Sequence, residues 1–408
     1  MLERAVVRRL DENENNKVDI GRLLDSALYY GKIHIILENG ILESIVKTIG
    51  ADGAYILLQN DAFTGYLTLS KQTVIVESNS NGSFFTPAAY SIVHNDPGKL
   101  EKLDYVDSIR QVFSYSNSNI ELSIPEAKRI LGNCRVFPGQ ELLGEENSTC
   151  AIWKSLVTNP DTLRNAIKSV AHQREFSIHQ SNLKEADFTL SYGGQSIQLE
   201  SSIDLQSILL SPSDQNAVDW VDIFKEIERY RTDIVFSRDL KSDLIVDDSS
   251  HEMSRFHIES ILENSLAGQG KIDQFESAVF ENGRTIGDAY NLGGITLSEA
   301  LGIIDKAARF KKWIHRKPFD ANLLREYIAE NNGISGLSKY PGRDLKFFLM
   351  QALNIAASAI LPGVGGVVVG AGLGAAETYL LPELEMGWRP NLFVADVQKA
   401  IRKRPIFE

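Results

Sequence analysis

The chain has 408 residues, of which 43% are hydrophobic, and a formal net charge of −12. This length and composition are enough for two domains that each bury a core. The acidic balance excludes a general nucleic-acid binder, whose surface would be basic, so no general nucleic-acid binding is expected.

The two cysteines, Cys134 and Cys150, are too far apart for a CxxC motif. Their spacing therefore predicts neither a zinc site nor a redox pair. Secreted proteins of this size often carry disulfides, and residues 1–14 contain no apolar signal segment. We expect a cytoplasmic protein, peripheral to a membrane only when triggered.

The first half of the chain alternates between strand and helix patterns. Short apolar runs predict strands, and apolar residues at helical spacing predict helices. Strands are expected at residues 5–10 and 33–37, and helices at residues 40–49 and 51–58 on either side of Gly50. Residues 66–70 and 73–77 alternate around Lys71-Gln72, which predicts a β-hairpin.

Further along, Ser123, Pro125 and Glu126 together signal the start of a helix. The remaining elements expected before residue 210 are a helix at 161–172 and strands at 176–178, 188–192 and 196–199, the last two joined across Gly193-Gly194. This half therefore mixes helices and strands.

Composition shifts at residues 211–214, and helical periodicity dominates the rest of the chain. Trp220, Ile223, Phe224 and Ile227 form one apolar stripe, and further helices are expected at residues 295–313, 321–328 and 393–401. The predicted fold class is α+β. A mixed α/β N-terminal domain at residues 1–210 precedes a mainly α-helical C-terminal domain at residues 217–408, which contains an apolar Gly/Ala-rich helical hairpin at residues 347–381.

Residues 347–376 carry no charged side chain, and Pro362-Gly363 divides the apolar segment into two arms. Proline ends the first helix, and the glycine after it permits a turn, so the pattern predicts a helical hairpin. The small residues that would let its arms pack closely, as in a glycine zipper, are Gly366, Gly370 and Gly374 on one arm and Ala352 and Ala356 on the other.

Each arm of about 15 residues would rise only ~22 Å, whereas a bilayer core is about 30 Å thick. Three placements fit this length: a hairpin buried in a soluble domain, a hairpin released onto a membrane, and a permanently inserted one. A basic patch precedes the hairpin in the sequence and consists of Lys306, Arg309, Lys311, Lys312, Arg316 and Lys317. It would either attract an anionic lipid surface or simply complement the dipole of its own helix.

The densest polar cluster lies at residues 243–259, and its candidate metal ligands are Asp247, His251 and Glu252. His251 and His257 do not have the four-residue spacing of a zinc protease. Capping of a helix by Asp247 and Glu252 explains the same residues without a metal. Gly370 to Gly374 lacks the Lys-Ser/Thr of a phosphate loop, so no cofactor is expected.

Three functions fit these patterns. The leading one is a non-enzymatic protein whose hairpin mediates packing, self-association or conditional membrane engagement at an anionic surface, as in a bacterial effector or defence protein. The second is a soluble enzyme, metal-dependent or not, that uses the cluster at residues 243–259. The third is a ligand-sensing module coupled to a helical output domain. The chain contains no catalytic signature, which favours the first and third.

Overall fold

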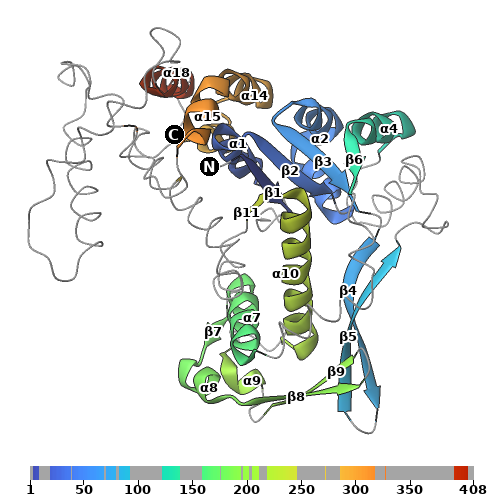
Figure 1. Cartoon of the computed structure of the whole chain (residues 1–408). Helices are drawn as coiled ribbons and strands as arrows, with labels where there is room; N and C mark the ends of the chain where they lie inside the picture. Colours follow the sequence, from blue (N-terminus) through green and yellow to red (C-terminus); the bar gives the residue numbers. More distant parts are fainter. Residues whose placement is uncertain are drawn as a thin grey trace, which may run out of the picture. The chain divides into compact units, whose positions relative to one another are not determined.

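A computed structural model describes residues 3–8, 19–37, 39–68, 70–79, 82–91, 122–137, 159–174, 176–193, 196–201, 205–210, 218–245, 272, 285–317, 327 and 390–402. The chain forms two compact units, residues 2–269 and residues 270–408. It contains helices together with parallel and antiparallel sheets, so the fold is mixed α+β (Figure 1).

A parallel sheet in the strand order β11-β1-β2-β3-β6 forms the centre of the first unit. Its strands are β1 (Arg4–Val7), β2 (Lys32–Leu37), β3 (Phe63–Leu67), β6 (Cys134–Val136) and β11 (Asp243–Ile245). The helices α1 (Ile20–Tyr29), α2 (Asn39–Gln59) and α4 (Ile124–Gly132) connect β1, β2, β3 and β6 in sequence. Because neighbouring parallel strands are joined by right-handed crossovers, these helices are expected on one face of the sheet.

Close packing on that face depends on Gly65 of β3. A Cβ atom at Gly65 would lie 2.6 Å from Leu37 Cδ1, 3.0 Å from Leu58 Cδ2 and 3.1 Å from Cys134 Sγ. Leu58 belongs to α2, so this helix sits directly on the strands. Within α2, Gly50 has φ 74° and ψ 170°, which confirms the predicted break between two helical segments.

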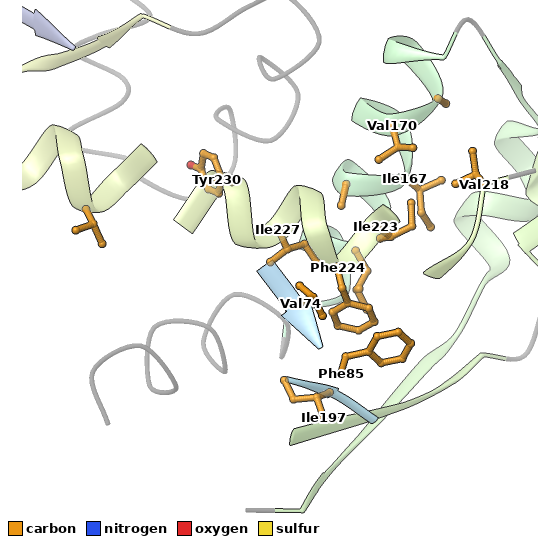
Figure 2. Close-up of a cluster of buried hydrophobic side chains, with 14 of the residues drawn as sticks. Val74, Phe85, Ile167, Val170, Ile197, Val218, Ile223, Phe224, Ile227 and Tyr230 are labelled. Carbon is orange, nitrogen blue, oxygen red and sulfur yellow. The ribbon is translucent and has the colours of Figure 1, made fainter. Parts of the chain in front are cut away.

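The opposite face of the sheet packs against α10 (Trp220–Leu240), which contacts β1 and β11. Phe236 of α10 meets Phe137, just after β6, with ring centroids 4.6 Å apart. The predicted apolar stripe is confirmed, since Ile223, Phe224 and Ile227 are fully buried (Figure 2).

The N-terminal half of α10 packs on a second sheet, which is antiparallel and has the strand order β4-β5-β9-β8. Its strands are β4 (Ser70–Asn79), β5 (Gly82–Ser91), β8 (Phe188–Gly193) and β9 (Ser196–Ser201). Phe85 of β5 stacks on Phe224 of α10 at 4.2 Å (Figure 2). The pairing of β8 with β9 across residues 194–195 confirms the second predicted hairpin.

The first predicted hairpin is wrong. Lys71 and Gln72 lie within β4, whose antiparallel partner is β5, and the register runs to Asn79 opposite Gly82. Tyr66 instead belongs to the parallel strand β3. Alternating apolar and polar residues indicate a strand with one apolar and one polar face. They do not indicate which strand it pairs with.

The helix α7 (Pro160–Gln173) lies beside α10 and confirms the helix predicted at residues 161–172. The remaining elements of this unit are β7 (Ser177–Ile178), α8 (Gln180–Glu185), α9 (Leu205–Ile208) and β10 (Leu209–Leu210). β7 and β10 pair antiparallel.

In the second unit, the described elements are α13 (Ile286–Asn291), α14 (Leu297–Lys306), α15 (Ala308–His315) and α18 (Pro390–Arg402). Thr296 and Glu299 form a capping box that begins α14. Phe310 of α15 stacks on Phe393 of α18 at 4.9 Å. The helix expected at residues 295–313 is two helices that meet at Ala307.

The helix α10 contacts strands of both sheets and belongs to the same compact unit. This unit therefore extends beyond the composition shift at residues 211–214. The division into domains at 1–210 and 217–408 stays a prediction. The hairpin at residues 347–381, with Gly366, Gly370, Gly374, Ala352 and Ala356, lies outside the described residues. None of the helices in the described ranges combines the length and apolar composition that crossing a bilayer requires.

Candidate functional site

The middle of α10 lies at the carboxyl edge of the parallel sheet. α10 ends at Leu240 and β11 begins at Asp243, so the helix reaches the amino edge at its C-terminus and runs back along the strands. Its middle turns then meet Arg8, which follows the last residue of β1. In open parallel α/β sheets, this carboxyl edge is where ligands bind.

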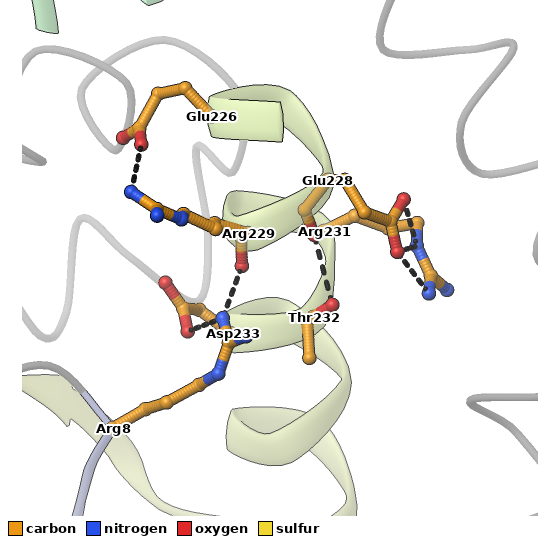
Figure 3. A network of polar contacts seen from close by, with 7 residues as sticks. All are labelled: Arg8, Glu226, Glu228, Arg229, Arg231, Thr232 and Asp233. Carbon is orange, nitrogen blue, oxygen red and sulfur yellow. Dashed lines mark hydrogen bonds and ion pairs between the residues drawn. The ribbon is translucent and has the colours of Figure 1, made fainter. Parts of the chain in front are cut away.

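Arg8 and Asp233 form a buried ion pair at this edge (Figure 3). Arg8 Nη1 lies 2.9 Å from Asp233 Oδ1, and the two side chains are 8% and 2% exposed. The same nitrogen donates a hydrogen bond of 2.9 Å to the carbonyl oxygen of Arg229. Arg8 therefore ties the end of β1 to the middle of α10.

Glu228 and Arg231 form a second buried pair (Figure 3). Arg231 Nε lies 3.0 Å from both carboxylate oxygens, and its Nη2 lies 2.7 Å from Oε1. Burial raises the pKa of Glu228, and the Arg231 charge opposes that rise. Two charges this deeply buried carry a desolvation penalty that their attraction only partly offsets, so the pair is weak evidence for stability alone.

Glu226 links α10 to α7. Its Oε1 accepts a hydrogen bond of 3.0 Å from the Ser169 hydroxyl, and its Oε2 lies 3.8 Å from Arg229 Nη1. Nearby, burial and the Asp233 charge both raise the pKa of the Tyr230 phenol. Along residues 226–233, the helix thus places ionised groups where an ordinary core would place apolar ones.

This segment, which we call the charged segment of α10, consists of residues 226–233. Groups whose ionisation is perturbed by burial and by a specific charged partner are enriched at functional sites. The arrangement offers paired donors and acceptors that a polar ligand can take over. In the described part of the chain, no group of three His, Cys, Asp or Glu side chains is placed to hold a metal ion.

Sequence patterns did not single out the charged segment. Its charged residues resemble those of a solvated helix surface, although Arg231 stands four positions after Ile227 and so on the side of the apolar stripe. A usable signal was the charge density itself, because Glu228 and Arg231 stand three positions apart, where helical side chains meet. Only the contacts with α7 and β1 show that both sides of the helix are covered.

The sequence-predicted candidates fall elsewhere. Asp247, His251 and Glu252 lie outside the described residues. The basic patch lies on α15 and the residues next to it, and its members differ in exposure. Lys311 and Lys317 are buried, and Lys317 Nζ lies 5.3 Å from the centroid of the Trp313 ring. The exposed members are Lys306, Arg309, Lys312 and Arg316.

The chain was compared with protein-family models, with curated proteins and with solved structures. None of the three comparisons finds a match.

Proposed function

We propose that residues 2–269 form a ligand-sensing unit, with a small polar ligand bound at the carboxyl edge of the parallel sheet beside the charged segment of α10. The observation that carries this proposal is the burial of two ion pairs, Arg8–Asp233 and Glu228–Arg231, at the edge where such sheets bind ligands. The chemistry proposed at this edge is an exchange of hydrogen bonds, with no covalent step.

The position of α10 explains how binding would be transmitted. The helix contacts β1 and β11 near its C-terminal end and β4 and β5 near its N-terminal end. A ligand that takes over hydrogen bonds of Arg8 or Asp233 favours one position of α10 over another, and both sheets share that helix. A ligand shifts such an equilibrium by its difference in affinity for the two positions.

A thermal-shift screen of nucleotides and polar metabolites tests this function. A ligand at 100-fold excess over its Kd stabilises the folded protein by about 2.7 kcal/mol, which raises Tm by several degrees. Hydrogen exchange then locates the site, and we expect slower exchange at residues 226–233 and at Arg8. A screen without any shift, or protection confined to other elements, would contradict the proposal.

A second candidate function rests on two observations about the C-terminal unit. Residues 347–376 carry no charge, and α15 holds exposed cations at Arg309 and Lys312 with no acidic residue between Ala308 and His315. An uncharged segment and a cationic helix suit an anionic membrane surface. We propose conditional membrane engagement, or self-association, of the hairpin as the output of this unit.

Liposome flotation with and without anionic lipid tests membrane engagement. We expect the wild-type chain to float only with anionic lipid, and Gly370→Glu to remain in solution, because a buried or inserted carboxylate is costly. Gly132→Glu is the matched control, since a side chain there meets nothing within 4 Å. Equal behaviour of the two variants would remove the support for this function.

A further inference from the structure

The antiparallel sheet ends on one side at a long strand edge. β4 is the last strand of this sheet, and its neighbour β5 pairs with all of its 10 residues, from Ser70 to Asn79 (Figure 1). On its other side, β4 pairs with no strand in the described ranges. An edge of this length presents a row of backbone N–H and C=O groups to which another strand can bind.

The side chains near the middle of β4 leave this edge open. Ile75 is 44% exposed and Val76 is 37% exposed, although neighbouring residues of a strand point to opposite faces of the sheet. Val74 is buried in the cluster that α10 covers (Figure 2), and Val76 lies on the same face, so this cover ends before Val76. The hydrogen-bonding groups of the edge point within the plane of the sheet, away from that face.

The pairing with β5 decides which backbone groups face outward. Asn79 and Gly82 lie opposite each other with only residues 80 and 81 between them, so they form the hydrogen-bonded pair that closes the hairpin. Hydrogen-bonded and non-hydrogen-bonded pairs alternate along an antiparallel ladder. The N–H and C=O groups of Gln72, Val74 and Val76 therefore point away from β5.

One antiparallel register between two copies of β4 uses these outward groups and also matches the charges of the strand. It places Val74 opposite Val74 of the second copy and Gln72 opposite Val76. Lys71 then lies opposite Glu77, and these two are the charged residues of β4. Cross-strand pairs of opposite charge stabilise a sheet, and like charges destabilise it. A register centred on Lys71 or on Glu77 would instead place like charges opposite each other.

We infer that two copies of this chain pair through the outer edge of β4, about a two-fold axis at Val74. The same residues of both copies form this contact, so it joins the two antiparallel sheets into one and closes at two copies. Backbone hydrogen bonds provide the attraction, and the Lys71–Glu77 pairs select the register. The contact lies outside the carboxyl-edge site and does not rest on the proposed function.

Sedimentation velocity of the full chain over a range of concentrations tests the contact. We expect an equilibrium between monomer and dimer. Lys71→Glu should weaken the dimer by roughly tenfold, because both symmetric pairs become pairs of like charge, and Glu77→Lys should weaken it equally. Lys128→Glu makes the same change of charge at an exposed position on α4 and should leave the equilibrium unchanged. A wild-type chain that stays monomeric, or equal weakening by Lys71→Glu and Lys128→Glu, would overturn the proposal.

A mixture of the two β4 charge variants tests the register itself. Chains with Lys71→Glu are negative at both positions, and chains with Glu77→Lys are positive at both, so the mixed pair has no like charges across the strands. We expect these variants to form heterodimers about as tight as the wild-type dimer, detected with a fluorescent label on one of them. If the mixture associates no better than either variant alone, the register is wrong.

Val76→Pro tests the backbone hydrogen bonds. It removes one outward N–H group and leaves the ladder with β5 intact, and such edge positions tolerate proline. We expect the variant to fold, as judged by circular dichroism, and to lose the dimer. A dimer that persists would place self-association on another surface, such as the hairpin at residues 347–381. A mass that grows beyond two chains would indicate head-to-tail pairing of β4 with β8. Either result contradicts the proposal.

Discussion

Replacing Asp233 by alanine is expected to lower the free energy of unfolding of the first unit by about 3–5 kcal/mol. The substitution leaves the Arg8 guanidinium buried without its carboxylate, while the 2.9 Å ion pair is lost. Equilibrium unfolding in urea, followed by circular dichroism, measures the change. The effect is large because an uncompensated buried charge is more costly than the pair is favourable.

Two further variants make this expectation specific. Arg8→Met in the Asp233→Ala background removes the stranded charge, so we expect the double variant to regain part of the lost stability. Asp239→Ala breaks the ion pair with Arg238, whose side chain is 48% exposed, and should change stability by less than about 1 kcal/mol. If Asp233→Ala changed the free energy of unfolding as little as Asp239→Ala, the Arg8–Asp233 ion pair would not be buried in solution.

Phe224→Ala should destabilise the first unit by about 3–5 kcal/mol, the usual loss for a fully buried phenylalanine. Phe224 has no exposed surface and stacks on Phe85 at 4.2 Å, which joins α10 to the antiparallel sheet (Figure 2). The substitution removes this stacking and leaves a cavity between them. Urea unfolding again gives the magnitude.

An exposed residue of the same sheet serves as the control for Phe224. Ile75 of β4 is 44% exposed, and Ile75→Ala should change the free energy of unfolding by about 0.5 kcal/mol or less. Hydrogen exchange adds a second readout, because loss of Phe224 should speed exchange in β4 and β5 before β1 and β2. A uniform increase in exchange would show that the two sheets unfold as one body.

Together the two variants examine two attachments of one helix. Asp233 joins α10 to the parallel sheet, and Phe224 joins it to the antiparallel sheet. The sensing function proposed for the first unit requires this shared helix to respond to a ligand beside Asp233 and to move its contacts at Phe224. The two single variants and their combination measure how strongly these two attachments are coupled.

Local patterns in the sequence predicted several elements correctly, because their causes lie within a few residues. The break at Gly50 follows from the left-handed φ that glycine adopts without strain. The helix start at Ser123 follows from a capping box with Glu126, which the structure contains. The stripe on α10 was visible because helical spacing brings Ile223 and Ile227 to one side.

Local sequence patterns did not predict other features of the structure. The strand at Tyr66 was expected to pair with the next strand, whereas it pairs with β2 and β6, far away in sequence. His34 looked like one position of a buried strand, and only the tertiary structure shows that its ring stacks on Tyr66 of the neighbouring strand.

The sequence alone therefore determined the mixed α+β class and where many of its helices and strands begin, since spacing, caps and glycines act over short distances. The tertiary structure decided that β11 lies beside β1 and that the charges of Asp233 and Arg231 are buried. The physical reason is that a charged residue on a helix has the same local pattern whether water or another element covers it. Burial is set by strand order and by helix packing, which join residues separated by most of the unit.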